Sequence, residues 1–179
     1  LGDVKCMQRL IADGADINSK NMHGWSPISR CARYGHLSAL RVLIEQGVKI
    51  DIRLNDGATP LIISTGEQHS GVVRALLENG ADPNAQNLEG TTAILLAALT
   101  GRADIIRTLI AGGADPDTRN SFKESLLFLV VERDFADGVR VLLEAGVNVD
   151  SRSPRGWTAL MRAAKYGRTS SARALIANG

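Results

Sequence analysis

The chain has 179 residues, of which 44% are hydrophobic, 22% charged and 4% aromatic, and its net charge is +2. This hydrophobic content suffices for a buried core, which excludes wholesale disorder, and the net charge is too small to indicate nucleic-acid binding. No apolar run approaches the roughly 18 residues that a membrane span requires, and no basic-then-apolar secretory signal opens the sequence.

Glycines divide the chain into units of constant length. Gly14, Gly47, Gly80, Gly113, Gly146 and Gly179 recur every 33 residues. A fixed period of this size is typical of a repeat array rather than of one globular domain. We predict a single array over 1–179 with these parts: the outer half of a truncated repeat at 1–20, repeats at 21–53, 54–86 and 87–119, a degenerate repeat at 120–152, and a last repeat without its closing loop at 153–179.

Each unit begins with a helix that is capped by a hydroxyl side chain. The cap position holds Ser26, Thr59, Thr92, Ser125 and Thr158. A Ser or Thr here accepts a hydrogen bond from the first helical turn, and the prolines that follow at 27 and 60 are tolerated at the first helical residue. Glycines at 35, 101 and 167 predict the end of this first helix.

A second helix follows in each unit. In the first full unit Leu37, Leu40, Leu43 and Ile44 lie on one face of this helix. The helix is predicted to end at the glycine that recurs every 33 residues, where the backbone commonly becomes left-handed. A polar turn, such as residues 81–84, then leads into a projecting loop. Each unit is therefore predicted as helix, turn, helix and loop.

The fourth unit departs from this pattern. A second glycine column at 24, 57, 90 and 156 is interrupted by Lys123, and residues 125–131 are more apolar than their counterparts. A lysine where the other units have a turn glycine lowers stability if the backbone there is left-handed. We expect this unit to be the first part of the array to unfold locally.

The sequence resembles the ankyrin repeats. The family pattern runs G-x-T-P-L-H-x-A-A, G-H, V-x-x-L-L and G-A-D-x-N; residues 57–61 match its start, Gly35-His36 its middle and residues 80–84 its end. The resemblance implies an all-α repeat solenoid, elongated and curved, of stacked helix-turn-helix units with projecting β-hairpin-like loops. The His of the pattern is absent from every unit, so its hydrogen bonds between repeats are not carried over. Its place is taken by Ser29, Ile62, Leu95, Phe128 and Met161.

The resemblance also implies where binding takes place. In this family the loop tips and the last exposed turn of each inner helix face the concave side and carry binding. The candidate partner-binding residues are Lys20, Met22, His23, Trp25, Arg33, Tyr34, Arg53, Asp56, Glu67, Arg119, Phe122, Arg133, Arg152, Arg155, Trp157, Lys165 and Tyr166.

Aromatic and basic residues occur together in two of the units. Trp25, Arg33 and Tyr34 in the first full unit correspond to Trp157, Lys165 and Tyr166 in the last. Such side chains are typical interface anchors, since they offer a large contact area at a small cost in entropy. We predict a non-catalytic scaffold for a protein partner of acidic or mixed charge. Each Trp has a second interpretation, in which it only covers the adjoining loop.

Two other functions stay open. A ligand-sensing domain of a larger effector protein could stack a nucleotide or another small anionic ligand on Trp157 and Tyr166, with Arg155 and Lys165 on the phosphates. A passive spacer would use none of these surfaces. Because the sequence begins on an outer helix and ends at a helix-closing glycine, we also expect it to be a piece of a longer array or protein.

Neither catalysis nor a cofactor is indicated. No metalloprotease His motif, phosphate-binding glycine loop or nucleophile elbow occurs, and we expect structural roles for His36 and His69 in the Gly-His column. Cys31 is predicted to be a buried, inert thiol. With no disulfide framework among two cysteines, we expect an intracellular protein, and we expect it to be monomeric.

One basic column lies outside the candidate surface. The outer helices carry Arg41, Arg74, Arg107, Arg140 and Arg173. In three units a glutamate follows four residues later, which predicts ion pairs within the helix and a solvated face. Binding of an acidic partner on this face is the weaker alternative, because such pairs carry little energy and no specificity.

Overall fold

The computed structural model describes residues 4–178, and within them the chain forms eleven α-helices. They are α1 (Val4–Ala12), α2 (Pro27–Tyr34), α3 (Leu37–Glu45), α4 (Pro60–Gly66), α5 (Ser70–Glu78), α6 (Ala93–Thr100), α7 (Ala103–Ala111), α8 (Leu126–Glu132), α9 (Ala136–Glu144), α10 (Ala159–Tyr166) and α11 (Thr169–Asn178). Apart from one isolated bridge between Arg119 and Ser125, these residues contain no β-structure. The helix end predicted at Gly179 lies outside them.

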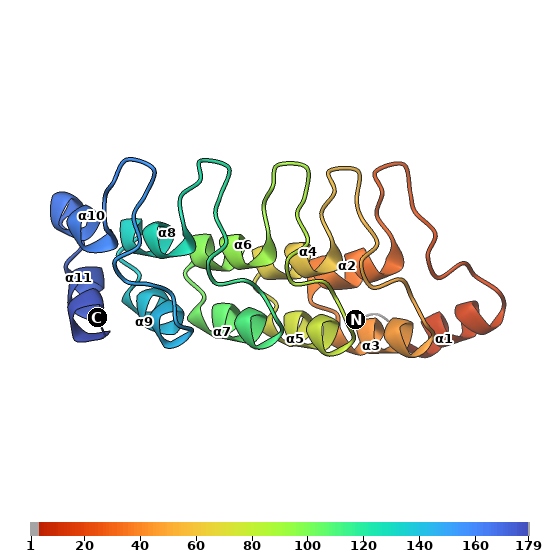
Figure 1. Ribbon diagram of the computed structural model, residues 1–179. Coiled ribbons are helices and arrows are strands. Elements are labelled where there is room, and N and C mark those ends of the chain that lie inside the picture. Colours follow the sequence, from red (N-terminus) through yellow and green to blue (C-terminus); the bar gives the residue numbers. More distant parts are fainter. Residues whose placement is uncertain (1–3, 179) are drawn as a thin grey trace.

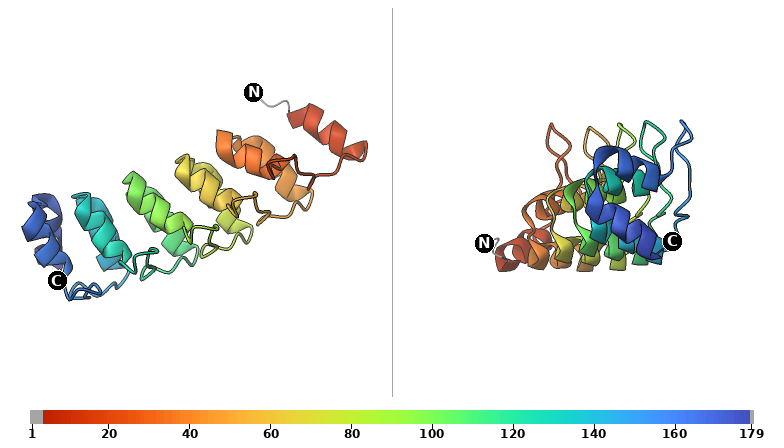
Figure 2. Two further views of the ribbon diagram at one scale, coloured as in Figure 1. Left: turned by 90° about the horizontal axis from the view of Figure 1, so that it is seen from above. Right: turned by 90° about the vertical axis from the view of Figure 1, so that its left-hand side faces the viewer.

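The helices form two parallel rows with loops projecting from one side (Figure 1). The inner row is α2, α4, α6, α8 and α10, and the outer row is α1, α3, α5, α7, α9 and α11. The direction of the helices changes progressively from one end of the stack to the other (Figure 2). The predicted all-α solenoid of helix-turn-helix units is therefore confirmed, and the stack is elongated along the direction of the chain.

The Ser and Thr residues at the cap position cap the inner helices as predicted, with one exception. In four units the Ser or Thr side chain accepts a hydrogen bond from the backbone N–H three residues later. In the fourth unit the Phe128 N–H donates to the Ser125 carbonyl instead, at 3.0 Å. The Ser125 hydroxyl consequently lies buried without a hydrogen-bond partner. An unsatisfied buried hydroxyl lowers stability at this point.

The absent family His is replaced differently from unit to unit. In the first full unit Ser29 forms a capping box with Ser26: the Ser29 N–H donates to the Ser26 hydroxyl, and the Ser26 N–H donates to the Ser29 hydroxyl at 2.8 Å. At the equivalent place in the fourth unit Phe128 is 1% exposed and fills core volume. The position therefore serves either local capping or packing.

One continuous apolar core runs along the array between the two rows of helices. In the fourth unit every side chain from Leu126 to Val131 is buried. The apolar run that departs from the repeat pattern is therefore a well-packed helix. The local losses of stability in this unit lie in its loop, at the unpaired Ser125 hydroxyl and at Lys123, which adopts the left-handed φ of +59°.

Polar contacts also join successive units. Arg102 binds Asp104 through two nitrogens and reaches back to the Gln68 side chain, while the Ser70 hydroxyl donates to Asp104 at 2.8 Å. Chiefly through the hydrogen bond from Arg102, these contacts lower the pKa of Asp104 to about 2. In the last unit the Ser171 N–H at the start of α11 donates to Asp134 at 2.7 Å, and this and related bonds lower the pKa of Asp134.

Replacing Lys123 by glycine should stabilise the protein. The left-handed backbone there strains a residue with a Cβ, so Lys123→Gly is expected to raise the free energy of unfolding by about 1 kcal/mol. The reciprocal change Gly90→Lys, at the equivalent turn with φ of +74°, should lower it by a similar amount. Chemical denaturation measures both, and no gain from Lys123→Gly would show that the turn is unstrained.

The contribution of Asp104 to stability should depend on pH. Because its pKa is depressed in the folded protein, the contribution is complete above the unfolded value of roughly 4 and is lost as the pH falls toward 2. Asp104→Asn should therefore reduce stability at pH 7 and much less at pH 2.5, as measured by urea denaturation at each pH. An equal loss at both values would contradict this assignment.

Candidate functional site

The loops and inner helices together form a surface that we call the inner surface. Among the described residues, eight of the ten large hydrophobic side chains that are exposed belong to these elements. The other two, Leu10 and Ile176, lie on the outer helices α1 and α11. The eight are Met22, Tyr34, Leu88, Leu99, Phe122, Leu160, Met161 and Tyr166.

The first predicted cluster assembles around the half-buried Trp25. The guanidinium carbons of Arg30 and Arg33 lie 4.7 and 5.4 Å from the centroid of its ring. Arg30 also donates to the Tyr34 hydroxyl at 3.4 Å, and Arg33 Nε lies 3.6 Å from Glu67 Oε1 of the next unit. Four predicted residues are thus brought together, and Arg30, which was not singled out from the sequence, joins them.

The second cluster lies near the other end of the array. Lys165 Nζ lies 5.0 Å from the centroid of a Trp157 ring and 5.1 Å from that of Tyr166, so the ammonium group faces both aromatic rings. The Trp157 N–H donates to the Ser153 hydroxyl at 3.2 Å, which fixes the backbone at the base of the loop. The three predicted residues are brought together here as well.

Four predicted basic residues at equivalent positions in the loops bind backbone carbonyls. Lys20 donates to the Arg53 carbonyl at 2.7 Å, and Arg53 donates to the carbonyls of Gln86 and Gly57. Arg119 and Arg152 each donate to the carbonyl four residues later, at 3.1 and 2.9 Å. These four predicted residues therefore order the loops, and their donors are already partly occupied.

Asparagine side chains hold several loop tips in one conformation. The Asn120 side-chain oxygen accepts from the N–H groups of Phe122 and Glu124, both at 3.0 Å. Asn21 and Asn87 make the same pair of bonds in their own loops. Phe122, which is 80% exposed, is consequently presented to solvent on an ordered turn.

The remaining predicted residues are exposed. Asp56 accepts from the Ala58 N–H at 2.9 Å, so its carboxylate is part of its own turn. Nothing among the described residues forms a hydrogen bond or ion pair with the side chains of His23, Arg133 or Arg155. Met22 is 85% exposed at the tip of the first loop. These four side chains are the ones free to contact a partner.

Sequence reasoning missed the central residue of the last junction, Arg162. Its guanidinium group lies 2.7 Å from Glu124 and 2.6 Å from Glu132 of the preceding unit, and 4.9 Å from the centroid of the Phe128 ring. Its side chain is only 14% exposed. The sequence does contain two glutamates in one unit and an arginine in the next, which could have indicated an ion pair. These residues come into contact only because α10 packs against α8.

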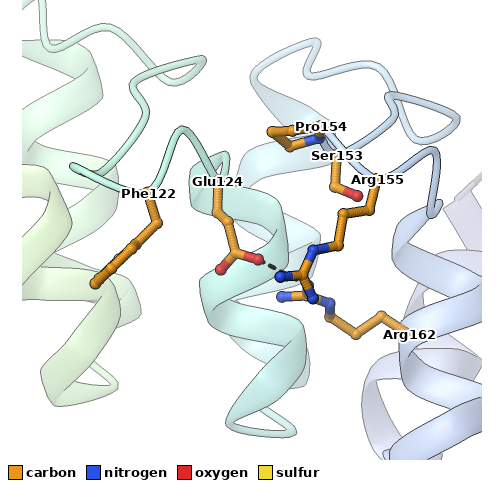
Figure 3. Close-up of a pocket in the computed structure, with 6 residues that line it drawn as sticks. All are labelled: Phe122, Glu124, Ser153, Pro154, Arg155 and Arg162. Carbon is orange, nitrogen blue, oxygen red and sulfur yellow. Dashed lines mark hydrogen bonds and ion pairs between the residues drawn. The ribbon is translucent and has the colours of Figure 1, made fainter.

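Two cavities lie beside Phe122. One of about 290 Å³ opens between the fourth and fifth loops, and Figure 3 shows its lining residues, with Arg155 directed down from its loop and the Phe122 ring turned away from Glu124. The other, of about 260 Å³, lies on the side of the third loop and includes the apolar side chains of Leu95, Leu99 and Leu129. Phe122 lines both cavities.

The arginines of the outer helices pair differently from the prediction. Among the described residues, no ion pair forms between an outer-helix arginine and the glutamate four positions later. Arg107 instead pairs with Glu144 of the next unit, and Arg140 with Asp137 of its own first turn. An arginine followed by a glutamate is the weaker order on a helix, so other carboxylates compete successfully.

Cys31 and His69, which the sequence analysis singled out, both have structural surroundings. Burial raises the pKa of the Cys31 thiol to about 11, as expected for an unreactive cysteine. His69 contributes to a junction through a 3.0 Å hydrogen bond with the Arg33 carbonyl. Within residues 4–178, side chains of His, Cys, Asp and Glu nowhere gather in threes that could hold a metal ion, and the helices there are too short to cross a membrane.

Comparison with known families identifies the class of protein. The family described as ankyrin repeats (3 copies) matches at residues 1–87, 55–120 and 94–179, which together span the whole sequence. The chain therefore belongs to the ankyrin repeat family. Members of this family are generally protein–protein interaction modules without enzymatic activity, and they are commonly intracellular.

Solved structures agree on the fold. The chain is similar to the crystal structure of an ankyrin repeat domain from Acinetobacter baumannii AYE, with a TM-score of 0.89 and 24% sequence identity. The match covers 99% of this chain and 93% of the other. Altogether 540 chains of solved structures match, while a search of curated proteins found no match.

Removal of Arg162 should loosen the last repeat. Arg162→Ala leaves Glu124 and Glu132, with side chains 23% and 41% exposed, without their shared cation. We expect a loss of about 2 kcal/mol, less than the roughly 3–5 kcal/mol of a fully buried pair. Chemical denaturation measures it. The control is Arg155→Ala, in the same cavity but unpaired, which should change stability by less than about 0.5 kcal/mol; equal effects would refute the role of Arg162.

Proposed function

We propose that this chain is a non-catalytic interaction module that binds a partner protein on its inner surface. The observation that carries the proposal is the presence of both aromatic–cation clusters on the loops and inner helices, together with the exposed apolar side chains of Met22, Leu88, Leu99 and Phe122. Isolated exposed apolar residues are ordinary, whereas a gathering on one surface is typical of interaction sites.

The two clusters suit the role of binding anchors. In each, a basic side chain lies against an aromatic ring, which restricts both groups before a partner arrives. Restricting side chains beforehand reduces the entropy lost on binding. Trp, Tyr and Arg are also the residues that contribute most where interfaces are dissected by mutation.

The charges on this surface favour a partner of mixed charge. Lys20 and Arg53 are held by carbonyl groups and Glu67 by Arg33, so these residues offer only part of their charge to a partner. Arg133 and Arg155 are free to bind acidic groups. We further propose that the module acts as a monomer inside the cell.

The geometry of the second cluster disfavours the nucleotide alternative. Lys165 already occupies a position against the Trp157 and Tyr166 rings. A base stacking on the ring faces that Lys165 covers would have to displace this ammonium group. A protein partner contacting the edges of the cluster would leave it intact.

The proposal is tested with a binder selected from displayed fragments of the source organism's proteins. The double change Trp157→Ala and Tyr166→Ala should weaken its affinity at least about tenfold, because interface anchors contribute roughly 2 kcal/mol or more. Isothermal titration calorimetry gives the affinity, and circular dichroism checks that the helices persist.

Ile176→Ala is the matched control. Ile176 is 68% exposed in the same repeat but lies on the outer helix α11, so its removal should leave the affinity unchanged. Hydrogen exchange with the binder present should protect loop and inner-helix amides. Protection confined to the outer helices would place binding on the other side and refute the proposal.

A further inference from the structure

Hydrogen bonds tie the first three loops to one another. Asn55 donates to the Met22 carbonyl at 3.1 Å, and the Leu88 N–H donates to the Asp56 carbonyl at 2.9 Å. A side chain reaches across at the base of each gap as well, since Arg53 donates to the Gln86 carbonyl at 2.6 Å. The gaps between loops one and two and between two and three are therefore bridged by hydrogen bonds to backbone carbonyls, both near the tips and at the base.

These cross-loop bonds end after the third loop. Between residues 86–92 and 119–125, and between 119–125 and 152–158, the described chain makes no hydrogen bond from loop to loop. The turn glycines show the same change. A Cβ on Gly24 or Gly57 would approach the next loop's backbone to 2.8 and 3.0 Å, whereas one on Gly90 would meet nothing within 4 Å. Loops four and five stand apart from their neighbours (Figure 1).

The two open gaps hold the two cavities beside Phe122, and their linings differ. The cavity between loops three and four is lined by apolar groups of Leu95, Leu99 and Leu129. The cavity between loops four and five is lined by Arg155 and Arg162 (Figure 3). Arg162 already pairs with Glu124 and Glu132, whereas Arg155 forms no ion pair among the described residues, so its guanidinium group is the one available to an anion.

We propose that these cavities form one two-pocket site for an extended segment of the partner protein, with an aliphatic side chain in the first pocket and an Asp or Glu carboxylate on Arg155. The site rests on the proposed function and names the part of the inner surface that gives it specificity. Phe122 is the wall between the pockets, and its position is fixed by the two bonds to Asn120.

The repeat geometry sets the spacing of the two side chains in the partner. The pockets are one repeat apart, and packed helices are separated by about 10 Å. An extended chain advances roughly 3.3 Å per residue and its side chains alternate between two faces, so the aliphatic and acidic residues, which must lie on one face, should be about two or four positions apart. The partner segment can extend beyond both pockets, because the gaps between the loops open along the array and do not end in a closed cavity.

A single free cation also limits the kind of anion. A phosphate group carries close to two negative charges and is usually bound by several donors. Arg155 alone, with Glu124 lining the same cavity, matches one carboxylate better. The internal acidic side chain of a protein segment is therefore the occupant that the charges favour.

Defined peptides test the site directly. The probe is a nine-residue peptide of Gly and Ser with Leu and Glu two or four positions apart, and both orders are synthesised. Binding to the full chain is followed by NMR titration with ¹⁵N-labelled protein. We expect shifts concentrated at residues 89–91, 120–124 and 153–156, and a dissociation constant at least fivefold weaker when Glu is replaced by Lys or Leu by Ala.

Reversing the charge at residue 155 distinguishes specific recognition from nonspecific binding. Arg155→Glu should weaken binding of the Glu peptide about tenfold and make the protein prefer the Lys peptide. Phe122→Ala should weaken both peptides. Ile176→Ala is the control, since Ile176 is also an exposed apolar side chain but lies on the outer helix α11. All three side chains are exposed, and circular dichroism verifies that each variant remains folded.

The outcomes distinguish this site from the broader function. If Glu and Lys peptides bind alike, or Ile176→Ala acts like Phe122→Ala, the two-pocket site is wrong, while protection of the inner surface by a selected binder would still support the interaction module. If no peptide shifts these residues, the site is also refuted. If the selected binder protects only the outer helices, both proposals fail together.

Discussion

The structure depends on burying each inner helix against the next. These helices have seven or eight residues, too few to be stable alone in water. Ile28, Leu61, Ile94 and Leu127 occupy the same place in successive repeats, and each is at most 1% exposed. Leu160 occupies that place in the last described repeat and is 42% exposed. Burial in this column therefore requires a following repeat, so stability arises between units rather than within them.

This constraint leaves the loops and helix ends as the places where the repeats differ. Loop tips contribute little to the core, so they hold residues as unlike as His23, Asp56, Phe122 and Arg155 at one position of the turn. Asparagine side chains in several loops order that turn. A regular scaffold thus presents a varied surface at a small entropic penalty, as an interaction module requires.

The contacts between loops differ along the array, and this difference determines where the inner surface has cavities. Its first three loops are joined by hydrogen bonds, while the fourth loop is joined to the inner helix α10 of the last unit by the ion pair of Glu124 and Arg162. Where the hydrogen bonds between loops end, space opens between the loops. The exposed Phe122 and the unpaired Arg155 lie at that space.

The sequence by itself determined the helices, their caps and the repeat period, because glycine, proline and hydroxyl residues act through local backbone geometry. It also predicted the Trp25 and Trp157 clusters, whose aromatic and basic residues belong to single repeats. The Arg107–Glu144 pair and the Arg162 junction were decided only by tertiary structure. Each joins residues 30 or more positions apart, and their meeting depends on how neighbouring repeats pack, which a pattern within one repeat does not specify.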